Sequence, residues 1–433
     1  MTDIVFSFDT EDFTSPYAAN AILDLANILR SEGIRGCFCI VGLLGKQLVN
    51  WGRTDILEAL KYHEINFHTY GHTLHPTICE YTENEDFDAA YREVIRQESA
   101  GINMVRAATG AERIYAAVPP GNDKSYAAMY AYADMGVPCY CDTFSDDGRG
   151  TWFCNQLHME YFHSLEEMHK RGWAEDKSFR DELASRAISV VYNHPNTTRC
   201  SEWWDVVNYQ GTNKHPFGQW VEAKRKTPEE TNAFLDDIRR FIKALKADGR
   251  FQFKTYAEIY AERRGGARYI QKEDLPAIRE AYADRIKPLS VPCSLCVADV
   301  FGAAVSYLRG AKLYAAGRVH GFLDTPAAIT EPVTVSVADV TEAAAKIDLD
   351  TFLPERYEVG GVVLGPADML MAMLGVLCGE TEIALTPREQ NIDLTDFPNL
   401  ANPPLTGWHV HAPDFDPVVL TKRLPLQAWT MRF

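Results

Sequence analysis

The sequence has no apolar run long enough to cross a membrane and no excess of positive charge. No window approaches the about eighteen uninterrupted apolar residues expected of a membrane-spanning helix. Acidic residues number 60 and basic residues 43, for a formal net charge of −17, so the electrostatic footprint of a nucleic-acid-binding protein is missing and anionic membranes are disfavoured. The chain also opens with strand-like residues, without the basic and apolar regions of a secretory leader. We therefore expect a cytoplasmic protein that binds neither nucleic acid nor membranes.

The ten cysteines are scattered along the chain. Some alternate at strand spacing, as Cys37 does with Cys39. Cys293 and Cys296 form a C-x-x-C pair, but their flanks offer no second pair to complete a four-cysteine zinc site. We therefore expect buried thiols.

Residues that could bind a metal gather in two short segments. A strand-like apolar run ends abruptly in three acids, Asp9, Glu11 and Asp12, as expected where a parallel strand opens into a cleft. His68 and His72 lie four residues apart, so one helical turn or a tight loop can aim both imidazoles at one point. Two histidines and one carboxylate, with open coordination positions, are the ligand set of a divalent-metal hydrolase. The remaining carboxylate is then free to act as a base.

Either Glu11 or Asp12 could supply the carboxylate ligand. Successive side chains of an extended strand end point to opposite sides, which places Asp9 and Glu11 on the same side and favours Glu11 as the ligand.

These residues and three later segments resemble the motifs of a known family. The segment from His68 to His72 fits the H-S/T-x-x-H motif of the polysaccharide deacetylases of the NodB-homology type, carbohydrate esterase family 4, whose first motif is an acidic cluster. The run from Pro119 to Gly121 resembles the end of the family's R-x-P-x-G motif, and the run from Tyr192 to His194 resembles its L-x-H motif. The resemblance covers about residues 1–262.

The resemblance implies a distorted (β/α) barrel and a metal-dependent hydrolase that removes N-acetyl groups from an amino sugar or polysaccharide, acting on amide but not peptide bonds. It assigns Asp9 as the base and His194 as the acid. The chemistry also needs such an acid, because an amine is a poor leaving group until it is protonated. Zn²⁺ is the first choice of metal, with Co²⁺, Ni²⁺ and Mn²⁺ as alternatives.

The chain departs from the family pattern at two places. The arginine that orients the catalytic aspartate falls at Ala117, so another cation should do this work; Lys124 is preferred over Arg113. The tryptophan of the fourth motif is not evident, although Asp146 and Asp147 lie in that stretch.

Aromatic residues follow the last motif. Loops rich in aromatics beside a polar site often hold sugar rings against their flat faces. The expected substrate-binding residues are Pro119, Pro120, Gly121, Trp203, Trp204 and Trp220.

Repeated βα units precede residue 265 and a different pattern follows it. A chain of 433 residues exceeds one typical domain. We expect an α/β catalytic domain over residues 1–265 and a smaller, mostly helical domain of unknown role over 266–433, a candidate surface for homo-oligomer formation. His409 and His411 share a strand face but lack a third ligand at a known spacing, so we assign them no metal site.

Two other functions fit the same residues. Ala117 suggests a catalytically inactive carbohydrate-binding protein, although Asp9, both ligand histidines and His194 argue against it. The third hypothesis is a hydrolase of a non-sugar C–N bond.

Overall fold

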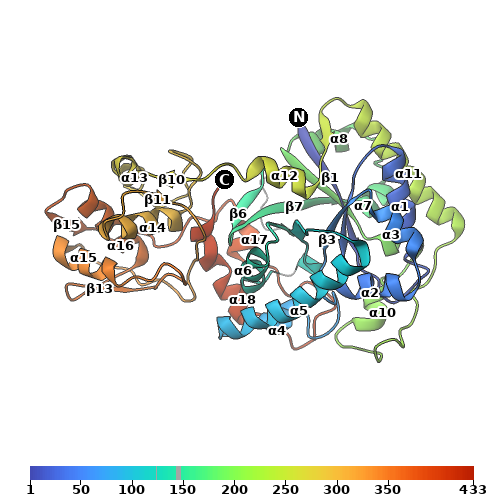
Figure 1. Ribbon diagram of the computed structural model, residues 1–433, viewed down its shortest axis with the longest axis horizontal. Coiled ribbons are helices and arrows are strands. Elements are labelled where there is room, and N and C mark those ends of the chain that lie inside the picture. The colour runs from blue at the N-terminus through green and yellow to red at the C-terminus, as the bar shows by residue number, and fades with distance from the viewer. Residues whose placement is uncertain (123, 143–147) are drawn as a thin grey trace. The chain divides into compact units, whose positions relative to one another are not determined.

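The chain forms two compact units, which we describe separately. The computed structural model describes residues 1–122, 124–142 and 148–433 (Figure 1). The first unit comprises residues 1–150, 156–264 and 403–420, and the second comprises 151–155, 265–402 and 421–433. Residues 403–420, here called the return segment, therefore come from the C-terminal part of the sequence but belong to the first unit.

The first unit is built on a closed parallel barrel, in which β1 pairs with both β2 and β8. The strands of the barrel, in spatial order, are β1 (Thr2–Thr10), β2 (Cys37–Ile40), β3 (Glu64–Phe67), β4 (Ala116–Ala117), β5 (Cys139–Asp142), β7 (Gln156–Ser164) and β8 (Ile188–Asn193). An additional strand, β9 (Phe251–Phe253), pairs with the start of β1. The predicted (β/α) barrel is confirmed.

Most of the barrel strands are short runs buried along their whole length, whereas the second half of β7 is part-exposed. Every residue of β1 is buried; Phe8 stacks on Phe38 with ring centroids 4.7 Å apart, and Phe6 contacts Phe241. Parallel strands enclosed by helices read as nearly continuous apolar runs for this reason. All the carboxyl ends of the barrel strands point to one mouth, where the acidic and histidine segments lie.

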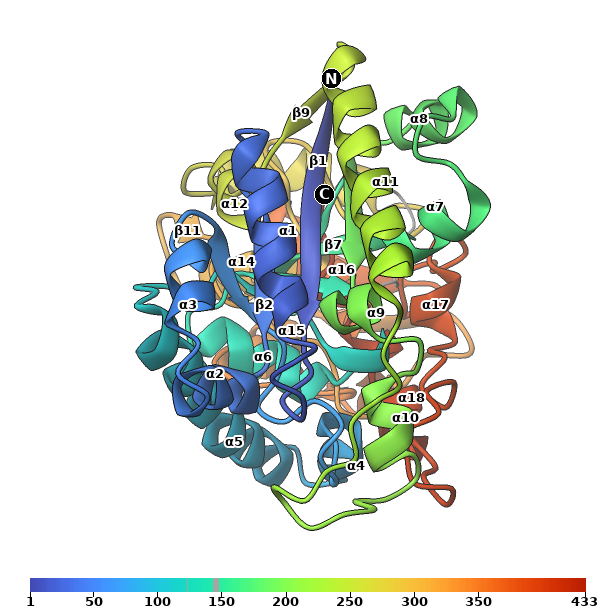
Figure 2. The ribbon, with the colours of Figure 1, turned by 90° about the vertical axis from the view of Figure 1, so that its right-hand side faces the viewer.

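Helices surround the barrel, and Figure 2 shows α1 and α11 flanking β1. At the start of α11, Thr227 and Glu230 form a capping box around Pro228, which satisfies the first N–H groups of the helix. The helices of the first unit are α1 (Asn20–Ser31), α2 (Gly42–Asn50), α3 (Thr54–Leu60), α4 (Ile78–Thr82), α5 (Phe87–Thr109), η1 (Pro120–Asn122), α6 (Tyr126–Asp134), α7 (Leu165–Arg171), α8 (Lys177–Ala184), α9 (Pro195–Arg199), α10 (Trp204–Tyr209), α11 (Pro228–Ala247) and α12 (Tyr256–Arg263).

The second unit contains the predicted helices together with small antiparallel sheets. Its helices are η2 (Lys272–Asp274), α13 (Leu275–Ala281), α14 (Val297–Leu308), α15 (Val337–Ala345), α16 (Pro366–Leu377), α17 (Pro398–Ala401) and η3 (Pro425–Thr430), while α18 (Val418–Arg423) begins in the return segment. Its strands are β6 (Thr151–Phe153), β10 (Tyr269–Ile270), β11 (Tyr314–Ala315), β12 (Val333–Ser336), β13 (Tyr357–Val359), β14 (Val362–Leu364) and β15 (Glu382–Leu385). Asp299, Asp339 and Asp368 lie in the first turns of α14, α15 and α16, where the helix dipole favours acids. No helix in the described part of the chain is both long and apolar enough to span a bilayer.

Candidate active site

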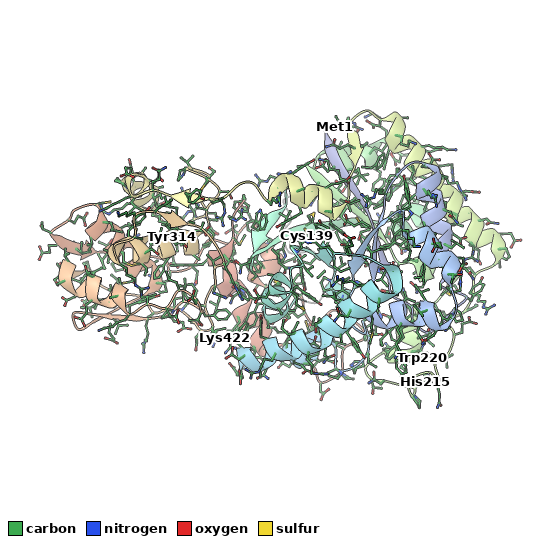
Figure 3. The ribbon with its side chains drawn as sticks, in the orientation of Figure 1. Met1, Cys139, His215, Trp220, Tyr314 and Lys422 are labelled. Carbon is green, nitrogen blue, oxygen red and sulfur yellow. The ribbon has the colours of Figure 1, made fainter. Side chains whose placement is uncertain are left out.

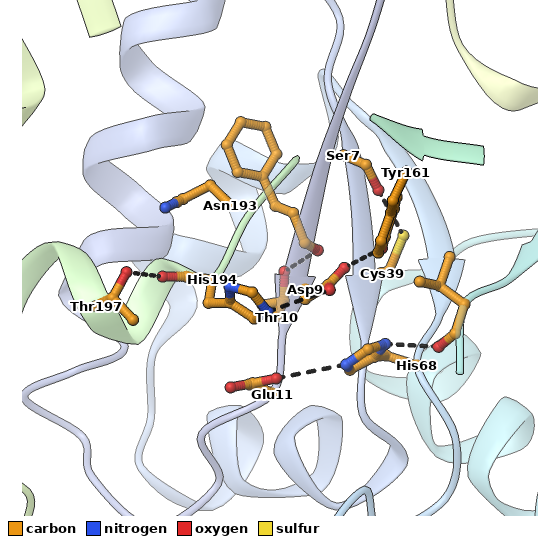
Figure 4. Close-up of polar contacts among 12 residues, drawn as sticks. Ser7, Asp9, Thr10, Glu11, Cys39, His68, Tyr161, Asn193, His194 and Thr197 are labelled. Atoms are coloured by element: carbon orange, nitrogen blue, oxygen red, sulfur yellow. Dashed lines mark hydrogen bonds and ion pairs between the residues drawn. The ribbon is translucent and has the colours of Figure 1, made fainter. Parts of the chain in front are cut away.

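Three buried side chains converge at the carboxyl mouth of the barrel. Glu11 follows β1, while His68 and His72 follow β3. Their potential ligand atoms all lie within 4.8 Å of one another. Glu11 Oε2 is 2.9 Å from His72 Nε2 and 3.5 Å from His68 Nε2. Figure 4 shows Glu11 and His68 facing each other. Within the described residues, no other cluster of histidine, cysteine and carboxylate side chains has this compactness.

The hydrogen bonding of the two histidines fits a metal site. His68 Nδ1 lies 2.6 Å from the carbonyl oxygen of Val118, a contact that requires a proton on Nδ1 and leaves Nε2 of the neutral ring with a free lone pair. Neither His68 Nε2 nor His72 Nδ1, both buried, has a hydrogen-bond partner among the described residues. Buried polar atoms are normally satisfied, so His68 Nε2, which lies 3.5 Å from Glu11 Oε2, fits the role of a cation ligand.

The structure brings Glu11, and not Asp12, to the two histidines. The Trp204 indole N–H donates to Glu11 Oε1 at 2.9 Å and so fixes the carboxylate. Asp12 Oδ1 instead accepts from the backbone N–H groups of Thr14 and Ser15, at 2.9 and 3.2 Å, and so stabilises the turn after β1. Burial raises the pKa of Asp12 to about 7.

The two histidines sit on a tight loop with an unusual backbone. Thr69 and His72 have φ angles of 66° and 51°, a left-handed region that non-glycine residues rarely adopt. The loop holds this shape because the Thr69 hydroxyl accepts the His72 N–H at 3.0 Å and the Thr69 carbonyl accepts the Gly42 N–H at 3.0 Å. The sequence left open a helical turn or a tight loop, and the structure has the loop.

A tyrosine hydroxyl and an imidazole contact Asp9. The Tyr161 hydroxyl donates to Asp9 Oδ1, and His194 Nε2 lies 3.6 Å from Oδ2 (Figure 4). Lys124 is buried, and Arg113 lies over the ring of Tyr115. The position of Arg113 argues against its role as the substitute cation, and the role of Lys124 stays a prediction. Burial raises the pKa of Asp9.

Glu166 holds His194, a role that the sequence did not indicate. Its Oε1 lies 3.1 Å from His194 Nδ1 and also accepts the backbone N–H of His194 at 2.8 Å. Burial disfavours the charged imidazole, but the hydrogen bond and charge of Glu166, with the charges of Glu11 and Asp9, raise the pKa of His194 to about 10. In the sequence, Glu166 looks like an ordinary acid in the first turn of α7.

A pocket of about 220 Å³ opens onto these groups. The residues that line it are Asp9, Glu11, His72, Pro119, Gly121, Tyr161, Tyr192, His194, Trp203, Asp205, Trp408 and His409. Of the expected substrate-binding residues, Pro119, Gly121 and Trp203 line the pocket, whereas Pro120, Trp204 and Trp220 do not.

The aromatic residues divide according to their neighbours. Trp203 places its ring edge-on to His194, with centroids 4.8 Å apart. Trp204 is fully buried and serves as the donor to Glu11. Trp220, labelled in Figure 3 with His215 on the loop after α10, packs against Phe217 with centroids 4.7 Å apart. Trp204 and Trp220 do not line the pocket, and contact of these two residues with substrate stays a prediction.

Five pocket residues were not expected. Tyr161 and Tyr192 stack with ring centroids 4.4 Å apart, and Asp205, Trp408 and His409 complete the lining. Asp146 and Asp147, which the sequence places near the fourth motif, lie outside the described residues.

Fold and site together define a (β/α) barrel with a candidate metal centre of the hydrolase type. No family model and no curated protein sequence matches the chain. Among solved structures, it is similar to an allantoinase (13% identity, TM-score 0.41, covering 61% of this chain and 92% of that chain). It is also similar to a protein provisionally described as a polysaccharide deacetylase from Mycobacterium smegmatis (14%, 0.40, 61% and 90%) and to a family 4 carbohydrate esterase from Streptomyces lividans in complex with acetate (14%, 0.32, 59% and 92%). These similarities concern the fold, and the functional argument below rests on the side chains.

Proposed function

We propose that the protein is a metal-dependent amidase that removes the acetyl group from the nitrogen of an amino sugar, free or within a saccharide. The observation that carries this proposal is the arrangement of two separate functional sets in one pocket. Glu11, His68 and His72 form a compact ligand group, while Asp9 and His194, each with its own hydrogen-bond partner, lie beside it.

The ligand group supports hydrolysis of an acyl bond. Glu11, His68 and His72 would hold a divalent cation. When bound, such a cation would polarise the acyl oxygen of the substrate and lower the pKa of a bound water. Zn²⁺ suits two imidazoles and one carboxylate, and Co²⁺, Ni²⁺ or Mn²⁺ are the alternatives.

Asp9 is the base in this proposal. Its Oδ1 is taken by the Tyr161 hydroxyl, which leaves Oδ2 toward the pocket. Burial raises the pKa of Asp9, which makes the carboxylate a better proton acceptor than an exposed aspartate. In this proposal Tyr161 orients Asp9, a role that Ala117 cannot fill where the family has an arginine. The main reason for the inactive-protein hypothesis is thereby removed.

His194 is the acid. With its pKa raised to about 10, the imidazole is protonated at neutral pH. Glu166 accepts the hydrogen bond from Nδ1–H of His194, so the Nε2–H group points toward Asp9 and the pocket. A proton held there can pass to the departing amine.

The decisive experiment combines metal content with product analysis. Elemental analysis of protein purified without chelator should show about one bound metal per chain, and acetate release should be measured on chitooligosaccharides and UDP-N-acetylglucosamine. The double variant His68→Ala/His72→Ala should lose both metal and acetate release, whereas His215→Ala, a histidine that does not line the pocket, should keep both.

The outcomes separate the three hypotheses. Bound metal with saccharide binding but no acetate release would favour the inactive carbohydrate binder. Cleavage of an open-chain or cyclic ureide, without activity on any acetylated sugar, would favour the non-sugar C–N hydrolase. Equal metal in wild type and the double variant would refute the ligand assignment.

A further inference from the structure

The return segment is anchored onto the barrel unit by backbone hydrogen bonds at several points. The Ala412 N–H donates to Glu80 Oε1 at 2.9 Å, and the Leu420 N–H donates to Glu83 Oε2 at 3.0 Å. The Val410 carbonyl accepts the Gly211 N–H at 3.0 Å, and the Val410 side chain is fully buried. The segment is therefore a fixed part of the first unit.

Trp408 of this segment lies across two of the loops that form the site. A β-carbon on Gly121 would come within 2.3 Å of the Trp408 ring, so the indole packs directly on the backbone of the turn after β4. The Trp408 ring also meets His72, after β3, edge-on with centroids 5.5 Å apart. Because β3 and β4 are neighbours in the barrel, the indole covers the mouth on this side.

The next residue of the segment reaches another loop. His409 Nε2 lies 3.4 Å from Asp205 Oδ2, in the first turn of α10. Asp205 is buried whereas His409 is exposed, and both line the pocket. The pair presents polar groups beside the aromatic face of Trp408.

The size of the pocket limits what it can hold. Its volume of about 220 Å³ is below the roughly 300–1,000 Å³ of sites for drug-sized ligands. An internal unit of a polymer would need an open path on both sides of the reacting group. The return segment, through Trp408, occupies the rim beside Gly121 and His72, so a saccharide that continued beyond the reacting unit on this side would meet the indole.

We infer that the return segment is a specificity wall that restricts the substrate to a single N-acylated amino-sugar unit, either free or at the end of a short saccharide. Trp408 packs on a face of the sugar ring, and the Asp205–His409 pair hydrogen-bonds its hydroxyl groups. Internal units of a long chain are excluded. This inference rests on the proposed function and adds the substrate class.

The first test maps the site of deacetylation. Chitohexaose is incubated with the wild type, and the deacetylated position is found by mass spectrometry of labelled products. We expect one acetate to be lost from a terminal unit only, and free N-acetylglucosamine to be a substrate. Deacetylation of internal units by the wild type would overturn the inference.

The second test measures binding without turnover. Calorimetric titration of N-acetylglucosamine into metal-stripped protein should give at least tenfold weaker binding for Trp408→Ala and for His409→Ala than for the wild type. Trp408→Phe should stay within about threefold, because it keeps an aromatic face. Trp51→Ala removes a tryptophan at the end of α2 that does not line the pocket, and it should bind like the wild type.

The binding test separates this inference from the proposed function. If the wild type releases no acetate but binds N-acetylglucosamine in a Trp408-dependent way, the proposed function is refuted. The inference that the return segment selects the ligand is then retained. If Trp408→Ala, shown by circular dichroism to be folded, binds the sugar like the wild type, the wall is refuted. Absence of sugar binding by the wild type would also refute it.

Discussion

Replacing Tyr161 by phenylalanine removes one hydroxyl and leaves the rest of its packing. The Tyr161 ring stacks on Tyr192 with an interplanar angle of 9°, and a phenylalanine ring can keep this contact. The change therefore isolates the hydrogen bond to Asp9 Oδ1. Without it, the carboxylate is free to rotate about its own bond and its productive orientation is lost for part of the time.

The size of the effect follows from the type of bond. A hydrogen bond to an ionised group contributes about 1.5–3 kcal/mol, which converts to roughly 10- to 160-fold in rate if all of it serves to orient the base. The same bond lowers the pKa of Asp9, so its removal makes the base stronger and works in the opposite direction. We therefore expect kcat to fall toward the lower end of that range, roughly 10- to 30-fold.

The assay is steady-state acetate release with metal content measured in parallel. KM and the bound metal should stay near the wild-type values, because Tyr161 is not among the ligand group. Tyr115→Phe, whose ring lies under Arg113 and does not line the pocket, is the matched control and should leave kcat unchanged. A kcat for Tyr161→Phe within threefold of the wild type would refute the argument that Tyr161 orients Asp9.

Three further predictions concern the metal, the acid and the return segment. Dialysis against a chelator should abolish acetate release, and added Zn²⁺ or Co²⁺ should restore it; activity that survives verified metal removal would contradict the metal-dependent mechanism. Glu166→Gln should slow amide substrates at least tenfold more than activated esters, because Glu166 supports the protonated form of His194 and an activated ester does not need a protonated leaving group; paired hydrolysis rates check this, and equal losses would contradict it. Burial raises the pKa of Glu80, but the hydrogen bond from His75 and the backbone N–H of Ala412 outweigh burial and lower the pKa to about 2. A depressed carboxyl pKa gives stability that is present above the unfolded value and lost as the pH falls through the folded value, so thermal unfolding should show a loss of roughly 2 kcal/mol between about pH 5 and pH 2. This loss should be smaller in Glu80→Gln, and identical pH dependence in both proteins would rule out this linkage.

The parts of the structure that could be predicted are those encoded in short stretches of sequence. The barrel strands are enclosed on both faces, so they appear as apolar runs that can be found without knowing their partners. Asp9 and Glu11 lie at the end of one such run, and His68 and His72 follow another. Parallel strands bring these ends together, and for this reason the ligand group could be predicted from the sequence.

The parts that could not be predicted depend on contacts between distant positions. Tyr161 meets Asp9 across 152 positions, and Trp204 meets Glu11 across 193. Neither residue carries a local signal, because a tyrosine in a strand and a tryptophan in an aromatic loop are ordinary. The search for a lysine or arginine beside Asp9 did not anticipate that a neutral tyrosine hydroxyl from a distant strand would donate to the carboxylate.

The return segment also has a consequence for how the site is assembled during folding. The bond between Ala412 and Glu80 joins positions 332 apart, whereas the histidines and the acidic cluster come from the first part of the chain. Contacts between distant positions form late, because the intervening chain must first be ordered. During synthesis, the metal ligands are therefore available long before Trp408 and His409 emerge. The groups proposed for the chemistry, from Asp9 to His194, are therefore in place before the residues proposed to select the substrate.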